Sequence, residues 1–208
     1  AYAAFAVVDD VLYVLGGQEK PDSTECSEKC YALDLLAPKD GWCELTPMPT
    51  PRMLAVAGVV EGKIYVAGGC SLHADAEGKA ERTYLDSVLR YDPATNEWET
   101  LETPAPETIV GAASPMPAKD GKLYLLCGDP GEFYRASLKG EAPEEHPGQN
   151  KTVYSYAPAT GEWKKEGENP TGIATAPAVE VEGSIYIISG ETHPGVRTPV
   201  ISTLKINK

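Results

Sequence analysis

The sequence predicts an all-β protein: a β-propeller with four visible blades, the last lacking its outer strand. Three observations support this fold. One strand pattern occurs four times, turn residues precede each copy, and a tryptophan follows three of the copies at the point where an outer strand would begin. The blades are expected at residues 1–50, 51–107, 108–170 and 171–208, within one propeller domain.

The repeated pattern is a short apolar strand with a central tyrosine that ends in glycine. Its four copies read VLYVLGG from Val11, KIYVAGG from Lys63, KLYLLCG from Lys122 and SIYIISG from Ser184. Each copy follows an acidic residue paired with Asp or Gly, which suits a tight hairpin turn. The apolar stretches before these turns are 3–8, 55–60, 111–116 and 174–181. Small residues dominate them, as expected for the innermost strands of a propeller, where backbones crowd around the channel.

The rest of each repeat supplies the outer strands. A third strand is expected at 30–35, 88–91, 153–156 and 200–206. In the second and third repeats it runs into YDPATNEW and YAPATGEW, where the Pro and the Asn or Gly make a turn and the tryptophan starts a fourth strand. The first repeat ends with Gly41-Trp42, and the fourth reaches Lys208 without a tryptophan.

This pattern resembles the kelch repeat over essentially the whole chain. The resemblance implies blades of ~50 residues with four antiparallel strands. The tyrosines and tryptophans are then expected to pack between blades, and the glycines to supply positive φ or close backbone approach. Kelch rings typically have six or seven blades. We therefore expect either additional blades before Ala1, which we favour, or self-association of two chains to complete a ring.

Composition narrows the choice of partners. The formal charge of −13 argues against nucleic acid and anionic membranes, and no apolar run approaches the ~20 residues of a membrane helix. The five cysteines do not form a zinc or disulfide pattern, and most are expected to be buried free thiols, although a Cys26–Cys30 disulfide remains open for an exported protein. No signal peptide is recognisable, and the first residues already read as a strand.

The loop after the fourth copy carries the strongest chemical signal. It reads GETHPGVRTP from Gly190, and the matching loops of the other repeats do not repeat this content. Glu191 and Arg197 flank a Pro-Gly turn. From spacing alone, the two residues are either a solvated surface ion pair or part of an anion site. His193, between them, is either a solvated loop residue or a proton relay.

This loop and the order of the repeats resemble bacterial N-acetylneuraminate epimerases, also called sialic acid mutarotases, which are six-bladed kelch propellers. The resemblance extends to a circularly permuted branch that places the remaining two blades first. It implies that Glu191 is the catalytic base, that Arg197 binds the sugar carboxylate, and that Arg52 is a second anion contact. His193, which lies in the same loop as Glu191 and Arg197, is predicted as a further substrate contact. The resemblance also implies a small acidic sugar as partner, no cofactor, and a periplasmic or exported location. For Arg52, a purely structural role at the blade rim is equally open.

The implied reaction suits these residue types. Anomers interconvert by ring opening and closing, for which a base takes the anomeric hydroxyl proton and an acid protonates the ring oxygen. A guanidinium binds a carboxylate through two parallel hydrogen bonds. The long segment 129–150 is expected to cover the channel mouth, whereas His73 and His146 are expected to be exposed.

Other functions remain as alternatives. The main one is a non-catalytic kelch propeller that binds a protein or a glycan, since this fold alone does not define an activity. A copper oxidase of the galactose-oxidase type needs a Tyr–Cys crosslink and two histidine ligands, and the three scattered histidines argue against it. A sialidase would carry Asp-box repeats, which are not found in the sequence.

Overall fold

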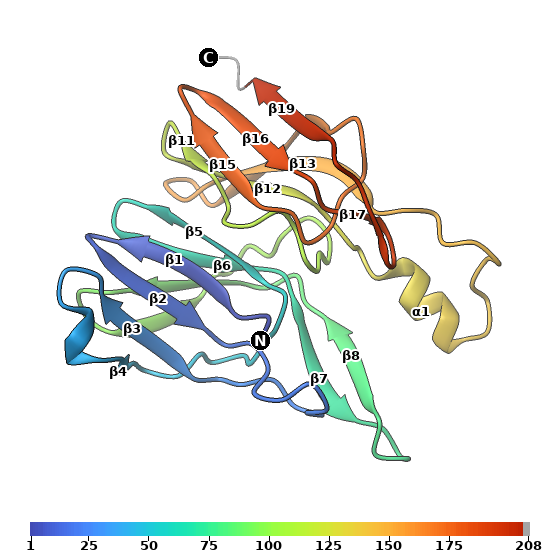
Figure 1. Cartoon of the computed structure of the whole chain (residues 1–208), viewed down its shortest axis with the longest axis horizontal. Helices are drawn as coiled ribbons and strands as arrows, with labels where there is room; N and C mark the ends of the chain where they lie inside the picture. The colour runs from blue at the N-terminus through green and yellow to red at the C-terminus, as the bar shows by residue number, and fades with distance from the viewer. Residues whose placement is uncertain (206–208) are drawn as a thin grey trace.

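The computed structural model describes residues 1–205, in which four antiparallel sheets follow one another along the chain (Figure 1). The first contains β1 (Ala4–Val8), β2 (Val11–Leu15), β3 (Cys30–Asp34) and β4 (Cys43–Glu44), with a 3₁₀ turn (Pro38–Asp40) before β4. The second contains β5 (Val56–Val60), β6 (Lys63–Ala67), β9 (Val88–Asp92) and β10 (Glu97–Thr100). A separate hairpin, β7 (Cys70–Ala74) and β8 (Ala80–Tyr84), is inserted between β6 and β9.

The third and fourth sheets are built in the same order. The third contains β11 (Ala118–Lys119), β12 (Lys122–Gly128), β13 (Asn150–Ala157) and β14 (Glu162–Glu168), with helix α1 (Glu132–Leu138) between β12 and β13. The fourth contains β15 (Ala178–Val181), β16 (Ser184–Ile188) and β19 (Ile201–Lys205), with the hairpin β17 (Glu191–His193) and β18 (Val196–Arg197) inserted before β19. The described part of the chain therefore confirms a kelch-type propeller arrangement whose last sheet lacks an outer strand. Ile206, the predicted end of the last strand, lies outside the described residues.

The predicted hairpins form because their turn residues accept positive φ. Asp9 and Asp10 have φ of 47° and 62°, and Asp120 and Gly121 have φ of 51° and 71°. Two consecutive residues of positive φ are the requirement of a type I′ turn, whose twist matches that of the flanking strands.

The predicted strand at 111–116 is wrong in its position. Regular pairing in the third sheet begins only at β11, because Pro115 and Pro117 have no N–H to give to a strand ladder. The segment still follows the expected path, since Ala113 donates to the Leu126 carbonyl at 3.0 Å and Met116 donates to the Ala57 carbonyl of the second blade at 2.7 Å. In the fourth sheet the predicted strand 174–181 likewise becomes regular only at Ala178, directly after Pro177.

Aromatic side chains join the first blade to the second and the second to the third, as predicted. Tyr13 of the first blade and Tyr91 of the second have ring centroids 6.0 Å apart, and Tyr65 of the second and Tyr156 of the third repeat this contact at 6.1 Å. Trp98 packs on Tyr91 and donates its indole N–H to the Thr46 carbonyl at 3.0 Å. The three main buried clusters lie between consecutive blades, so the core consists of blade–blade interfaces.

The glycine that ends each repeated strand is required by close backbone approach. Gly190 has φ of 111°, and a Cβ there would lie 2.0 Å from Ile173 Cγ2. Gly69 has φ of 82°, and a Cβ would lie 2.6 Å from the Met53 carbonyl oxygen. The preceding position is also crowded in the first two blades, where a Cβ at Gly16 or Gly68 would lie 2.7 or 2.3 Å from a carbonyl oxygen. In the last two blades Cys127 and Ser189 adopt positive φ there. These values confirm the prediction that the glycines supply positive φ or close backbone approach.

The first and last sheets both expose apolar side chains. Phe5 and Val7 on β1 are 42% and 50% exposed, and Val179 and Val181 on β15 are 44% and 47% exposed.

Within residues 1–205, no helix is long and apolar enough to cross a membrane.

Candidate functional site

A cavity of about 840 Å³ opens where the repeated second strands end. Residues of all four blades and of both inserted hairpins line it, among them Gln18, Arg82, Asp129, Glu191 and Arg197. A site built from four successive repeats is typical of propellers, whose loops converge at one end of the channel.

One backbone geometry places four equivalent residues around this region. The residue after each strand-ending glycine exchanges two backbone hydrogen bonds with the residue leading into the innermost strand of its blade. For Asp129 and Val110 both bonds measure 2.8 Å, and for Glu191 and Ala174 they measure 2.8 and 2.9 Å. The equivalent positions hold Gln18, Cys70, Asp129 and Glu191. The blades thus share a geometry but not a chemistry, and a carboxylate is present only in the third and fourth.

Glu191 and Arg197 are brought together by the β17–β18 hairpin. They are register partners across the two strands, and the Pro194-Gly195 turn that joins the strands matches the predicted turn. Residues directly opposite on antiparallel strands have Cβ atoms about 4.5–5.5 Å apart and project from the same face. Glu191 is half-buried, Arg197 is exposed, and both line the cavity.

Within the described residues, neither Glu191 nor Arg197 belongs to an ion pair or a side-chain hydrogen bond. The surface ion pair considered from spacing alone is therefore not formed. A carboxylate and a guanidinium that face one cavity without partners are both available to a ligand.

His193 lies outside this arrangement. Its ring is exposed and forms an edge contact with His146, with ring centroids 6.1 Å apart. It is not among the residues that line the cavity. Its predicted substrate contact therefore finds no support in this geometry.

Arg52 occupies the structural role that the sequence left open, and the geometry does not fit its predicted contact with substrate. It is 1% exposed and does not line the cavity. Its guanidinium donates to the carbonyls of Thr50, Gly68 and Ser87 at 3.2, 3.1 and 2.9 Å, and to Ser87 Oγ at 2.9 Å. Burial lowers the pKa of Arg52 to about 10. Arg52 ties together the inner and outer parts of its own blade.

Comparison with known proteins identifies the family of this chain. A family model described as N-acetylneuraminate epimerase matches residues 23–147, which is more than half of the chain. The chain belongs to the N-acetylneuraminate epimerase family.

Individual relatives agree with this assignment. An N-acetylneuraminate epimerase of Yersinia enterocolitica is 30% identical over 96% of this chain and 54% of its own length, and one of Haemophilus influenzae is 28% identical over 93% and 54%. A solved structure described as "Structure of YjhT" superposes with a TM-score of 0.79 at 26% identity, covering 98% of this chain and 62% of that one. The chain spans about half the length of the curated relatives it matches.

Sequence reasoning missed several residues of this epimerase-family cavity. His146 was expected to be exposed, but it is half-buried and lines the cavity, and its ring packs at a tilt against Phe133 with ring centroids 4.6 Å apart. The Gly148 N–H donates to His146 Nδ1 at 3.0 Å, so the neutral ring carries its proton on Nε2. Arg82 and Asp129 also line the cavity. Arg82 and His146 lie outside the repeated pattern, whereas Asp129 occupies the position that Glu191 holds in the fourth blade, which was the signal that could have found it.

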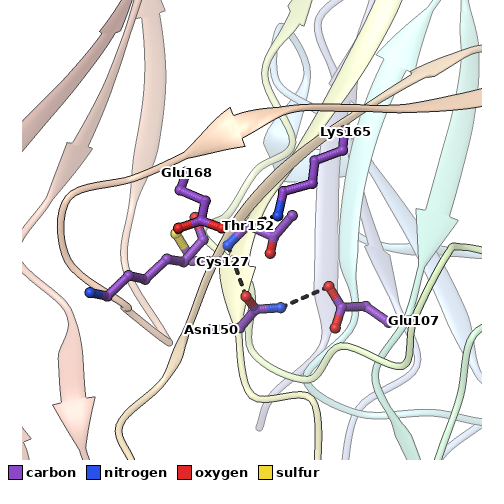
Figure 2. Close-up of polar contacts among 7 residues, drawn as sticks. Glu107, Cys127, Asn150, Thr152, Lys165 and Glu168 are labelled. Atoms are coloured by element: carbon purple, nitrogen blue, oxygen red, sulfur yellow. Dashed lines mark hydrogen bonds and ion pairs between the residues drawn. The ribbon is translucent and has the colours of Figure 1, made fainter.

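The end of the long insertion is fixed by polar contacts in the third blade (Figure 2). Asn150, at the start of β13, donates through Nδ2 to Glu107 Oε1 at 2.8 Å, and its Oδ1 accepts the Thr152 N–H at 2.8 Å. The side-chain amide of Asn150 is therefore engaged in the fold through both its nitrogen and its oxygen. Gln149, adjacent to this anchor, lines the cavity and donates its backbone N–H to the Thr192 carbonyl at 3.1 Å. The insertion is thereby tied to the β17–β18 hairpin.

The cysteines do not contribute to the site. All five are free thiols, so no Cys26–Cys30 disulfide is present. Cys30, Cys70 and Cys127 are buried as predicted, whereas Cys43 is exposed. Among residues 1–205 there is no cluster of three or more His, Cys, Asp or Glu side chains that could hold a metal.

Proposed function

We propose that this protein is a sialic acid mutarotase that interconverts the α and β anomers of N-acetylneuraminate. The observation that carries the proposal is the pairing of Glu191 with Arg197 across one hairpin, where both line the cavity and neither side chain has a partner among residues 1–205. Relatives named N-acetylneuraminate epimerase support the choice of sugar.

The proposed reaction uses Glu191 as the base. The carboxylate takes the proton of the anomeric hydroxyl at C2, the C2–ring oxygen bond breaks, and C2 becomes a carbonyl while the ring oxygen takes up a proton from water. Rotation about the bond to C2 followed by the reverse steps closes the ring on the opposite face. The proton is returned, and the sugar is neither oxidised nor reduced.

Arg197 would hold the sugar during these steps. The sugar carries its carboxylate on the carbon that reacts, so a guanidinium that binds this carboxylate also fixes the position of C2. Because Arg197 and Glu191 are register partners on one hairpin, the proposed anion contact and the proposed base would approach the ligand from the same side.

The test is anomer exchange. α-N-acetylneuraminate is released freshly by a sialidase, and its anomeric signals are followed by NMR with wild-type chain, with Glu191→Gln, and with Glu182→Gln as a matched control in the exposed turn of the same blade. Acceleration by wild type and by the control, but not by Glu191→Gln, would support the proposal. Exchange at the uncatalysed rate with wild type would contradict it and favour a non-catalytic binding propeller.

Three further expectations stay predictions. The exposed apolar faces of β1 and β15 are consistent with self-association to complete a ring, which sedimentation of the purified chain would test. The circular permutation with two additional blades and the periplasmic or exported location rest on the family resemblance alone.

A further inference from the structure

The cavity contains a second arginine that the reaction described above does not use. Arg82 lies on β8, in the hairpin that the second blade inserts, and lines the same cavity as Glu191 and Arg197. Within residues 1–205, it forms no ion pair with a carboxylate. The third cation of the cavity, Lys79, is already paired with Glu77 at 2.7 Å. Two arginines are therefore left to meet an anion in a chain of net charge −13.

The backbone around Arg82 is held by the insertion of the third blade. The Arg82 N–H donates to the Tyr134 hydroxyl of α1 at 3.0 Å. Two residues along β8, the Tyr84 hydroxyl donates to Asp129 Oδ2 at 2.6 Å. The rings of Tyr84 and Tyr134 pack with centroids 5.7 Å apart, and the Arg135 guanidinium lies 5.6 Å from the centre of the Tyr84 ring. The β7–β8 hairpin and α1 are thus joined by these contacts, and we call this joined unit the clasp.

Asp129, another carboxylate of the cavity, receives its hydrogen bonds from the same part of the structure. Asp129 Oδ1 accepts the Gly131 N–H at 2.7 Å, and Oδ2 accepts the Tyr84 hydroxyl. Burial raises the pKa of Tyr84, and the hydrogen bond to Asp129 raises it further, so the hydroxyl stays protonated and can donate at neutral pH. Asp129 is therefore engaged by protein donors, whereas Glu191 and the exposed Asp22 accept no side-chain hydrogen bond among residues 1–205. Arg82 contacts the Tyr84 hydroxyl but, like Arg197, has no carboxylate partner there.

We propose that Arg82 is the second anion contact of the site and binds the acidic sugar together with Arg197. Tyr84, Tyr134 and Asp129 are positioning residues that hold the β7–β8 hairpin at the cavity wall. The identity of the sugar rests on the proposed function. The sequence assigned this second contact to Arg52, which is buried in its own blade.

The test compares binding of N-acetylneuraminate with binding of its methyl ester, which has the same ring without the charge, by titration calorimetry. Arg82→Gln should weaken binding of the acid about 10-fold or more and change binding of the ester little, because a charge-assisted contact is lost. Arg82→Lys should keep part of the preference for the acid. Arg90→Gln, which removes an arginine paired with Glu99 away from the cavity, is the matched control and should behave as wild type.

Tyr134→Phe tests the clasp. It should reduce the preference for the acid over the ester about 3-fold with little change in ester binding, which a merely structural loss would not produce. Equal affinity of wild type and Arg82→Gln for the acid, in protein that accelerates anomer exchange, would overturn this proposal alone. A loss of acid binding in Arg82→Gln without exchange by wild type would overturn the mutarotase function and leave the anion contact standing. No binding of the acid by wild type would overturn both.

Discussion

Replacing Arg52 with methionine separates a structural role from a role in substrate binding. The four hydrogen bonds of Arg52 come from a charged donor, and at about 1.5–3 kcal/mol each they would sum to roughly 6–12 kcal/mol. Dehydration of the buried guanidinium costs several kcal/mol, and methionine, which fills a similar stem volume, avoids that cost. When the dehydration cost that methionine avoids is subtracted from the lost hydrogen bonds, Arg52→Met is expected to lower the free energy of unfolding by about 2–5 kcal/mol. Most of this loss comes from carbonyls that are left without donors.

For a chain of this size each kcal/mol lowers the melting temperature by about 2–4 °C, so Arg52→Met should melt roughly 4–20 °C below wild type. The assay is thermal unfolding followed by circular dichroism. Arg90→Met is the control: its guanidinium is exposed and paired with Glu99, and it should shift the melting temperature by no more than a few degrees. Below the transition, Arg52→Met should bind the acidic sugar as wild type does. An unchanged melting temperature together with weakened binding would refute the structural role.

The other predictions concern burial, backbone and pH. In native protein at pH 8, iodoacetamide should label exposed Cys43 first, whereas Cys127, whose pKa burial raises to about 12, should react only after denaturation; peptide mass spectrometry measures both. Gly190→Ala should destabilise by several kcal/mol because its Cβ would meet Ile173 at 2.0 Å; chemical denaturation that matches wild type would contradict this packing. Hydrogen bonds from Lys164 and, to a smaller extent, Ser155 lower the pKa of Glu166 below the usual 4.5. The stability that Glu166 contributes is therefore present above that pH and is lost as the pH falls. Glu166→Gln should therefore show a shallower loss of stability below about pH 4.5.

The strands and blade contacts were predictable because each follows from local chemistry that the chain repeats. Tyr13 and Tyr65 occupy the same place in successive copies, and burial against the next blade is the consequence of that repetition. The small residues of segment 111–116 predict an inner strand, but Pro115 within it and Pro117 directly after it delay regular pairing to β11. A proline in a strand interrupts the ladder whatever the apolar pattern around it.

The site was predictable only in part, for a similar reason. Glu191 and Arg197 are close in sequence on one hairpin, so their pairing follows from the Pro-Gly turn between them. Arg82 and His146 reach the same cavity from other blades, through long insertions that no repeat pattern describes. Arg52 showed the opposite error: its place at the entrance of an inner strand does not reveal whether its guanidinium turns outward or is satisfied by nearby carbonyls.

The most direct test of the account replaces Glu191 and Arg197 one at a time and measures the effect of each replacement on kcat and on KM. Anomer exchange of N-acetylneuraminate is measured by NMR over a range of sugar concentrations for Glu191→Gln and Arg197→Gln. The account predicts that Glu191→Gln lowers kcat about 100-fold or more with KM little changed, the effect expected for loss of a general base. It predicts that Arg197→Gln mainly raises KM, about 10-fold or more. A Glu191→Gln variant that turns over as fast as wild type would contradict the central claim.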